Sequence, residues 1–349
     1  MAWRRDALEL ATRFCAMLAP RSADPPPEPR SIFVLRNNDL GDVLVVTPLF
    51  EALRRRFPRA RIVAGVGDWA APILAGNPHV DETLPINAPW HNGQIRPQGV
   101  PAALRYLATS REAARLAARR FDIGIDVLGS AFGSLLLMRA GIPFRLGVRG
   151  YAGGHSAVQR RLEFDAGEHV GRFALRFAEL LGATDLPDNR PQIHLAADAV
   201  PNEAIVFAPG SGYVEKCWPA EHFAALAKLA SDLPLTVIGG AKDRAAGALV
   251  AAAGAHVRDL TGQLSLAECF AVISAARAVV CNSSMAMHAA AAFRKPCLAV
   301  LGPQFTDAGE HAAQWAYPET RVLGQSAGHP RLWTPDEVWT VLGRLLSAA

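Results

Sequence analysis

The chain has 349 residues, half of them hydrophobic, and contains no apolar run of the length that crosses a bilayer. Lysine and arginine number 36 against 32 acidic residues, and the net charge of +4 is too small to indicate a nucleic-acid partner. The five cysteines are scattered and form no Cys-x-x-Cys pair, which argues against a disulfide framework and a zinc site. We therefore expect a cytoplasmic protein that is large enough for two domains.

The first 30 residues are expected to form an amphipathic helix followed by a proline-rich linker, RSADPPPEPR. Asp6, Glu9 and Arg13 interrupt the apolar run that a secretory signal would need. The apolar residues of the helix recur at helical spacing, at Trp3, Ala7, Leu10, Phe14, Met17 and Leu18. Such a helix suits a membrane surface and equally suits packing against its own domain, so the sequence leaves both open.

From Ser31 onward, short apolar runs alternate with helical stretches, which is typical of α/β domains with parallel sheets. Residues 31–190 are predicted to form a Rossmann-like domain with strands at 31–36, 61–65, 81–86 and 121–128. A proline-containing stretch, 186–203, leads into a second Rossmann-like domain at 191–349. Its strands are predicted at 204–210, 235–240, 256–260, 278–282 and 297–302, and its last helix either stays with it or packs back on the first domain.

Ligands of such sheets bind at the carboxyl ends of the strands, so the residues that follow each strand are the functional candidates. After strand 204–210, Gly212 allows close backbone approach, Ser211 offers a hydroxyl and Lys216 a cation. A phosphate would satisfy all three, although an ordinary glycine turn with a solvated lysine has the same pattern. Asp243 follows the next strand, where an acid often binds a ribose hydroxyl and where a helix cap is equally expected.

Ser283 and Ser284 follow strand 278–282 at the start of a helix, whose unpaired N–H groups and dipole favour an anion. His288, one turn later, can donate to the same anion or can be a structural residue. Together these three strand ends indicate a bound nucleotide diphosphate in the second domain.

The first domain carries a different chemistry after its first strand, in RNNDLGDVLVVTP. A carboxylate would repel a diphosphate, but it suits the removal of a proton from an attacking hydroxyl. Asp42, which follows Gly41 at the head of a helix, is the candidate base. Asp39 is expected to be a helix cap.

Several segments in this order resemble glycosyltransferase family 9, the ADP-heptose:lipopolysaccharide heptosyltransferases, from about Ser31 to the carboxyl end. LGDVLVVTPLFEALRRRFP resembles the opening Gly-Asp motif of the family, and FDIGIDVLGSAFGSLLLMRAGIPFRLG resembles its mid-domain segment. KCWP resembles its Lys-x-Trp-Pro element, and NSSMAMHAAAAF resembles its Asn-Asp-Ser-Gly-x-x-His signature. The family usually has aspartate where this chain has Ser283 and glycine where it has Met285.

The resemblance implies a GT-B fold, with two Rossmann-like domains facing across a cleft, and an inverting transfer that needs no metal or other cofactor. It implies that Asp42 is the catalytic base. It further implies that the ADP-sugar contacts the second domain through Ser211, Gly212, Lys216, Asp243, Leu264, Ser283, Ser284, Met285 and His288.

The sequence thus predicts a cytoplasmic transferase that moves a heptose or similar sugar from an ADP-sugar to a lipopolysaccharide core or another glycan. Arg54, Arg55 and Arg56 fit either contact with acidic head groups at the inner membrane or a solvated helix end. Two other functions stay open. One is a GT-B enzyme that uses another nucleotide sugar, such as a UDP-sugar transferase or epimerase. The other is a non-catalytic nucleotide or glycan binder that has lost turnover through Ser283 and Met285.

Overall fold

The computed structural model describes residues 2–197 and 199–348, and the side chains of residues 8–197 and 199–347. The chain forms two compact units. Unit 1 comprises the residues up to Ala166 together with Val170–Asn189, and unit 2 comprises Gly167–His169 and the residues from Arg190 onward. The amino-terminal helix and linker, expected as a separate segment, belong to unit 1. No helix in the described part of the chain is both long and apolar enough to span a bilayer.

Unit 1 contains six parallel strands in the order β3-β2-β1-β4-β5-β6. Their bounds are β1 Ser31–Leu35, β2 Arg61–Val66, β3 Glu82–Pro85, β4 Ile123–Asp126, β5 Phe144–Arg149 and β6 Arg160–Glu163. The central strands are almost entirely buried, as expected of a sheet with helices on both faces.

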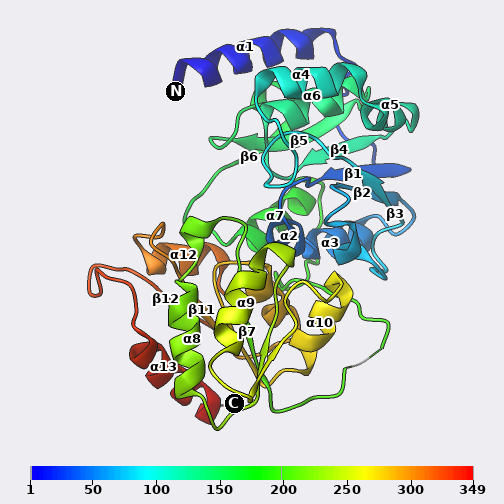
Figure 1. The fold of residues 1–349 in the computed structure, drawn as a ribbon. Coiled ribbons are helices and arrows are strands. Elements are labelled where there is room, and N and C mark those ends of the chain that lie inside the picture. Colours follow the sequence, from blue (N-terminus) through cyan, green and yellow to red (C-terminus); the bar gives the residue numbers. More distant parts are fainter. Residues whose placement is uncertain (1, 198, 349) are drawn as a thin grey trace. The chain divides into compact units, whose positions relative to one another are not determined.

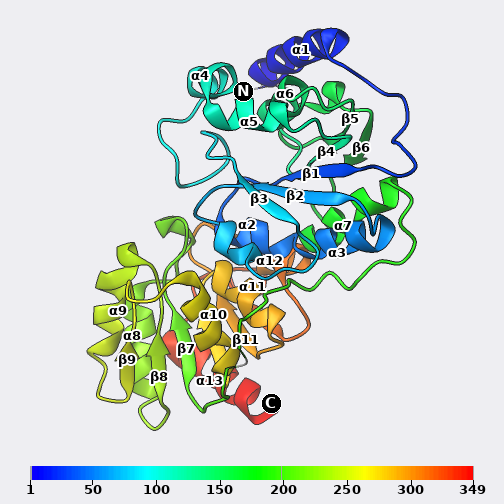
Figure 2. The same cartoon turned by 90° about the vertical axis from the view of Figure 1, so that its right-hand side faces the viewer.

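Helices cover both faces of this sheet (Figures 1 and 2). One face carries α1 Ala2–Leu18, α4 Val100–Thr109, α5 Arg111–Ala118 and α6 Ala131–Arg139. The other carries α2 Leu40–Val45, α3 Pro48–Arg56 and α7 Val170–Leu180, and two short 3-10 helices, η1 Ala71–Leu74 and η2 His155–Ala157, lie in the loops. The core joins Phe33 of β1 to Leu107 of α4, Leu116 of α5 and Leu137 of α6, so these helices are held by their apolar sides.

Unit 2 repeats the same architecture, with six parallel strands in the order β12-β11-β10-β7-β8-β9. Their bounds are β7 Ile205–Ala208, β8 Leu235–Val237, β9 Val257–Asp259, β10 Ala278–Cys281, β11 Cys297–Val300 and β12 Thr320–Leu323. The helices are α8 Ala220–Leu229, α9 Arg244–Ala251, α10 Leu266–Ala275, α11 Met285–Ala292, α12 Ala308–Trp315 and α13 Pro335–Ala348, with 3-10 turns η3 Val214–Lys216 and η4 Ala241–Asp243.

The last helix, α13, belongs to unit 2, where Val338 and Leu342 join the core formed by Phe223 of α8 and Val250 of α9. Within unit 2, α13 packs on α8, which covers its apolar side.

The predicted α/β class is confirmed, and each strand predicted in the two domains is present. Three strands were not predicted: β5, β6 and β12. β6 (RRLE) and β12 (TRVL) each lie at one edge of their sheet and contain at most two apolar residues, while β5 carries a buried arginine, Arg145. Polar edge strands lack the apolar run that identifies a central strand.

In both sheets the strand order reverses next to the first strand of the unit, between β1 and β4 in unit 1 and between β7 and β10 in unit 2. Crevices at such points are the usual ligand sites of α/β sheets. The predicted residues Asp42, Ser211, Lys216 and Ser283 all follow one of these four strands.

Candidate functional site

In unit 1, Asp42 lies in the first turn of α2, directly after β1. Its Oδ1 is 3.0 Å from Nη2 of Arg36, and the Arg36 Nε donates to the Asp42 backbone oxygen at 3.1 Å. Arg36 is buried, whereas the Asp42 side chain is 31% exposed. The guanidinium therefore contacts both the carboxylate and the backbone of Asp42 and leaves the carboxylate accessible to a substrate.

Asp39 occupies the cap position of α2 but makes no side-chain bond to the helix, so its expected capping role is wrong. Instead its Oδ1 accepts a hydrogen bond from the backbone N–H of Gly93 at 2.9 Å. Asp39 thus ties the β1 loop to the loop that follows β3, a long-range contact that local sequence does not reveal.

A second carboxylate, Asp126, lies at the end of β4, the neighbour of β1. Its Oδ2 accepts the Ser130 backbone N–H at 2.7 Å, and the Ser130 hydroxyl in turn caps α6 through Gly133 N. Burial raises the pKa of Asp126 to about 6, although these hydrogen bonds and the charge of Arg36 oppose the shift. Asp126 and Arg36 are polar groups at the switch point to which the sequence analysis assigned no role.

In unit 2, the β7 loop carries the predicted Ser211, Gly212 and Lys216. Lys216 ends η3, with its Nζ 5.2 Å from the centre of the Tyr213 ring, and both residues line an open pocket of about 710 Å³. The Nζ of Lys242 donates to the backbone oxygen of Ser211 at 2.5 Å and approaches that of Gly212 at 3.4 Å. This loop is therefore flanked by two lysines, and Lys242 was not predicted.

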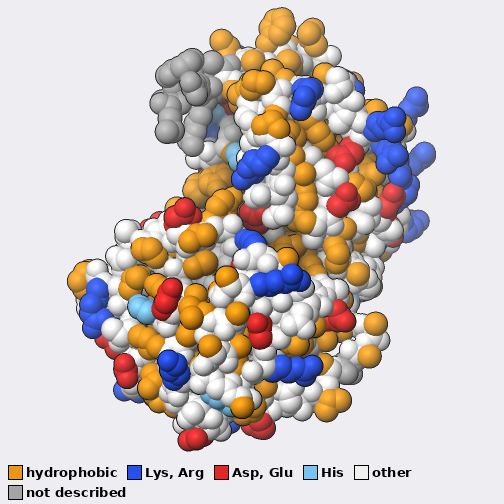
Figure 3. Space-filling view, in the orientation of Figure 1, with side chains coloured by type: hydrophobic (Ala, Val, Ile, Leu, Met, Phe, Trp, Pro, Cys, Tyr) orange, Lys and Arg blue, Asp and Glu red, His pale blue; other side chains and the backbone are white. Residues whose placement is uncertain are grey.

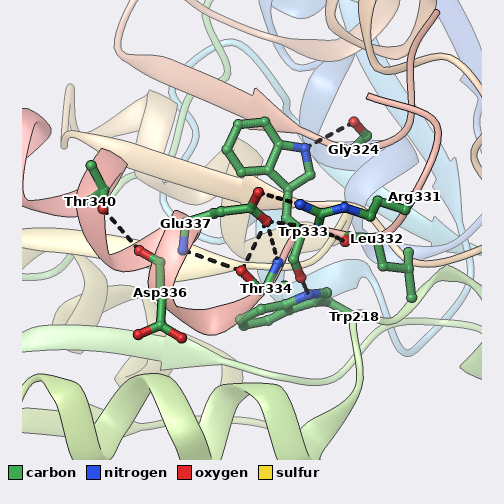
Figure 4. A network of polar contacts seen from close by, with 9 residues as sticks. All are labelled: Trp218, Gly324, Arg331, Leu332, Trp333, Thr334, Asp336, Glu337 and Thr340. Atoms are coloured by element: carbon green, nitrogen blue, oxygen red, sulfur yellow. Dashed lines mark hydrogen bonds and ion pairs between the residues drawn. The ribbon is translucent and has the colours of Figure 1, made fainter. Parts of the chain in front are cut away.

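Trp218, from the KCWP segment, fixes this loop to its neighbours. It is fully buried, and its backbone N–H donates to Oδ1 of Asn282 at 2.9 Å. Asn282 Nδ2 in turn donates to the backbone oxygen of Pro209. Figure 4 shows the Trp218 indole N–H pointing to the backbone oxygen of Trp333, at 2.8 Å. The ends of β7 and β10 are thus joined through buried hydrogen bonds, which set the position of Lys216 relative to the β10 loop.

The β10 loop meets the β7 loop at Ser283. The Ser211 hydroxyl donates to the Ser283 backbone oxygen at 3.1 Å, and Ser283 Oγ lies 2.8 Å from Nε2 of His311 in α12. Ser284 is the cap residue of α11 without a side-chain cap bond, and Met285 begins that helix, half-buried. The β7 and β10 loops are therefore in direct contact.

Two buried histidines, His288 and His311, lie close to the β10 loop. Burial lowers the pKa of His311 to about 4, and the positive charge of Lys216 acts in the same direction. Burial, with His169 and His311 nearby, lowers the pKa of His288 to about 3. The His288 ring packs against Trp315 and Tyr317, and its Nδ1 has no hydrogen-bond partner among the described residues. Both side chains are therefore neutral at physiological pH.

The remaining predicted residues lie around the same sheet edge. Asp243 Oδ2 accepts the backbone N–H of Gly240 at 2.8 Å and so stabilises the turn at η4. As the cap residue of α9, Asp243 makes no side-chain bond to that helix. A Cβ on Gly210 would lie 2.4 Å from Asp243 Cγ, so glycine at 210 lets the β7 loop approach this carboxylate. Leu264 is half-buried in the loop before α10, whose start is capped by Ser265 and Glu268.

Sequence reasoning missed His311, which lies 28 residues from Ser283. The signal for it was indirect: Asp307 caps α12, accepting from Gly309 N and Glu310 N, and α12 follows β11, the neighbour of β10. A histidine in the first turn after such a cap lies at the ligand-binding edge of the sheet.

The sequence model of glycosyltransferase family 9 (heptosyltransferase) matches residues 110–317 of this chain. Lipopolysaccharide heptosyltransferase 2 of Escherichia coli (strain K12) is 30% identical over 302 residues, which cover 79% of this chain and 84% of that protein.

Two solved structures have the same fold. The structure of E. coli ADP-heptose lps heptosyltransferase II matches with a TM-score of 0.69 and 25% identity, over 91% of this chain and 99% of that chain. E. coli heptosyltransferase WaaC with ADP-2-deoxy-2-fluoro heptose matches with a TM-score of 0.70 and 20% identity, over 90% and 99% of the two chains. The two parallel six-stranded sheets are thus those of a GT-B glycosyltransferase, and the chain belongs to glycosyltransferase family 9, the heptosyltransferase family.

Proposed function

We propose that this glycosyltransferase moves a heptose or a similar sugar from an ADP-sugar to a lipopolysaccharide core or another glycan, with inversion at the anomeric carbon and without a metal ion. The observation that carries the proposal is the joining of the β7 and β10 loops, through Ser211 and Ser283, beside the cation of Lys216. The named relatives support the donor and acceptor classes, since one acts on lipopolysaccharide and another was solved with an ADP-heptose analogue.

The donor diphosphate is assigned to unit 2. Lys216 supplies a positive charge, the start of α11 supplies N–H groups at Ser284 and Met285, and Ser211 and Ser283 supply hydroxyls. These groups together can stabilise the charge that develops on the departing ADP, which is the task a metal ion performs in other transferases. Asp243, Leu264 and His288 are proposed to contact or support the nucleotide from the neighbouring loops.

The acceptor hydroxyl is assigned to Asp42. Its carboxylate takes the proton as the hydroxyl oxygen attacks the anomeric carbon, the new glycosidic bond forms, and the bond to the ADP oxygen breaks with its electron pair leaving on the diphosphate. Arg36 orients the carboxylate through its contacts to Oδ1 and to the Asp42 backbone oxygen.

We place the reaction in the cytoplasm, at the inner face of the membrane where a lipid-linked acceptor is presented. The arginines of α3 give little support for membrane contact there. Arg54 pairs with Asp81 at 2.6 Å, Arg55 pairs with Glu51, also at 2.6 Å, and Arg56 Nε donates to the backbone oxygen of Leu181. Their charges are engaged within unit 1, which favours the solvated helix end.

The donor assignment is tested by melting the protein with ADP and with UDP, because a ligand that binds only the folded state raises the melting temperature. We expect ADP to give the larger shift. A larger shift with UDP would favour an enzyme of another nucleotide sugar.

Turnover is tested by ADP release from ADP-heptose with a lipopolysaccharide acceptor, with and without EDTA, and by NMR of the product. The proposal predicts that EDTA leaves the rate of ADP release unchanged. It also predicts that the anomeric configuration of the product linkage is opposite to that of the ADP-sugar donor. If the protein binds ADP but releases none from any ADP-sugar, it is instead a non-catalytic binder. Its Ser283 and Met285, where the family has aspartate and glycine, would then account for the lost turnover.

A further inference from the structure

Helix α1 packs on unit 1 through the side that carries Glu9 and Thr12. Thr12 is fully buried, and the helix contacts α6 and η2. The carboxylate of Glu9 accepts the backbone N–H groups of Gly154 and Ser156 at 2.5 and 2.7 Å and lies 3.4 Å from His155 Nδ1. These charge-assisted bonds fix the rotation of the helix about its axis.

The apolar side of the same helix consequently faces solvent. Leu10, Phe14, Met17 and Leu18 are 64 to 79% exposed, and their spacing of four, three and one residues puts them on one side of the helix. A helix of a globular domain normally buries this side, and no described residue covers it here. An exposed row of large apolar side chains marks a surface that binds an apolar partner.

Exposed arginines lie on α1 and on two other helices of the same face of the sheet. Exposed Arg13 lies on α1 itself, and Arg105, Arg111 and Arg115 are exposed on α4 and α5. Figures 1 and 2 both place these helices on the same face of the sheet as α1, and Figure 3 shows basic side chains gathered near α5 and hydrophobic ones over α1.

Two carboxylates in the described part of this region are turned inward. Glu9 is bonded to η2, and Glu112 accepts hydrogen bonds from Asn87 and from the Tyr106 hydroxyl. Two further apolar side chains, Val100 and Leu104, are each 49% exposed one turn apart on α4. The described part of this surface therefore combines exposed apolar side chains with exposed arginines.

We propose that α1 docks unit 1 on an anionic lipid bilayer, with Leu10, Phe14, Met17 and Leu18 inserted at the interface and the arginines against lipid head groups. An apolar row flanked by arginine is the composition of helices that lie in a membrane interface. A second copy of the chain would set the same arginines against each other, so the charge favours lipid. This goes beyond the proposed reaction, because binding to lipid requires neither donor nor turnover.

The test is co-sedimentation of the full chain with vesicles of phosphatidylcholine, with or without phosphatidylglycerol. We expect binding to the anionic vesicles that weakens with added salt, and weaker binding to the neutral ones. The double variant Phe14→Ser/Met17→Ser should bind at least about tenfold more weakly, because it lacks two large apolar side chains that would move from water into the bilayer on binding.

The matched control is Leu229→Ser/Leu249→Ser, which replaces two exposed apolar side chains on α8 and α9 of unit 2 and should bind as the parent does. Arg13→Gln/Arg105→Gln should weaken binding to the anionic vesicles only. All variants should melt with the parent, since each altered residue is exposed.

Absence of binding by the parent, or parent-like binding by Phe14→Ser/Met17→Ser, would overturn the proposal. The proposal would also be overturned if the parent did not bind vesicles and light scattering showed that it is a dimer, which the double variant dissociates. Vesicle binding without sugar transfer would count against the proposed function alone, so the two failures are distinguishable.

Discussion

The buried pair His288 and His311 predicts that unit 2 loses stability at mildly acidic pH. Both pKa values are lowered by burial, to about 3 and about 4, whereas an unfolded histidine has a pKa of about 6.5. Below that value the unfolded chain binds protons that the folded chain does not. The contribution of the two histidines to the unfolding free energy is therefore fully present above about pH 6.5. It decreases as the pH falls and levels off only near the pKa values of the folded state.

The size of the loss follows from these values. Between about pH 7.5 and 5.5 each histidine costs about 1.3 kcal/mol, so the pair together costs about 2.6 kcal/mol of unfolding free energy. Urea unfolding at a series of pH values measures this directly. In His311→Gln the amide can still bond to Ser283, but one titrating group is gone, so the loss over this range should be about 1.3 kcal/mol smaller than in the parent.

Ser283→Ala is the matched control, because it removes the hydroxyl beside His311 Nε2 and keeps both histidines. It should retain the full pH dependence. Free-energy curves of the parent and His311→Gln that run parallel from neutral to acidic pH would refute the buried, neutral state of His311.

Two further substitutions test unit 1 and the donor site. Gly133→Ala should lower the unfolding free energy by about 1–3 kcal/mol, because its Cβ would lie 2.0 Å from Asp126 Oδ2, whereas Gly343→Ala, with open space around it, should not. Equal melting temperatures for the two would contradict the close packing at Asp126. Lys216→Met should weaken ADP binding about tenfold or more by calorimetry, and Lys228→Met on α8 should leave it unchanged. Parental ADP affinity in Lys216→Met would remove that lysine from the donor site.

The parts of the fold that depend on local sequence patterns were predictable. Buried central strands such as β1 and β10 are continuous apolar runs and were located from sequence, as was the start of α11 after Ser284. β6 and β12 were not, because outermost strands need no apolar run.

The site was predictable where it follows a strand and unpredictable where it depends on a distant partner. Asp42, Lys216 and Ser283 were found from their positions after β1, β7 and β10. The Arg36 contact to Asp42, the Asp39 bond to Gly93 and the His311 contact to Ser283 arise from side-chain directions and from pairing across loops. The outward face of α1 was likewise not predictable from local sequence. The hydrogen bond that Glu9 accepts from the backbone of Gly154 helps to decide which side of that helix is covered.

The most direct test of the proposed reaction is the turnover number of Asp42→Asn with ADP-heptose and a lipopolysaccharide acceptor, measured together with its affinity for ADP. A general base contributes about 10²–10⁴-fold, so we expect turnover to fall by that factor while ADP binds as in the parent. Turnover within about twofold of the parent would show that another group takes the proton, and the mechanism proposed for Asp42 would be wrong.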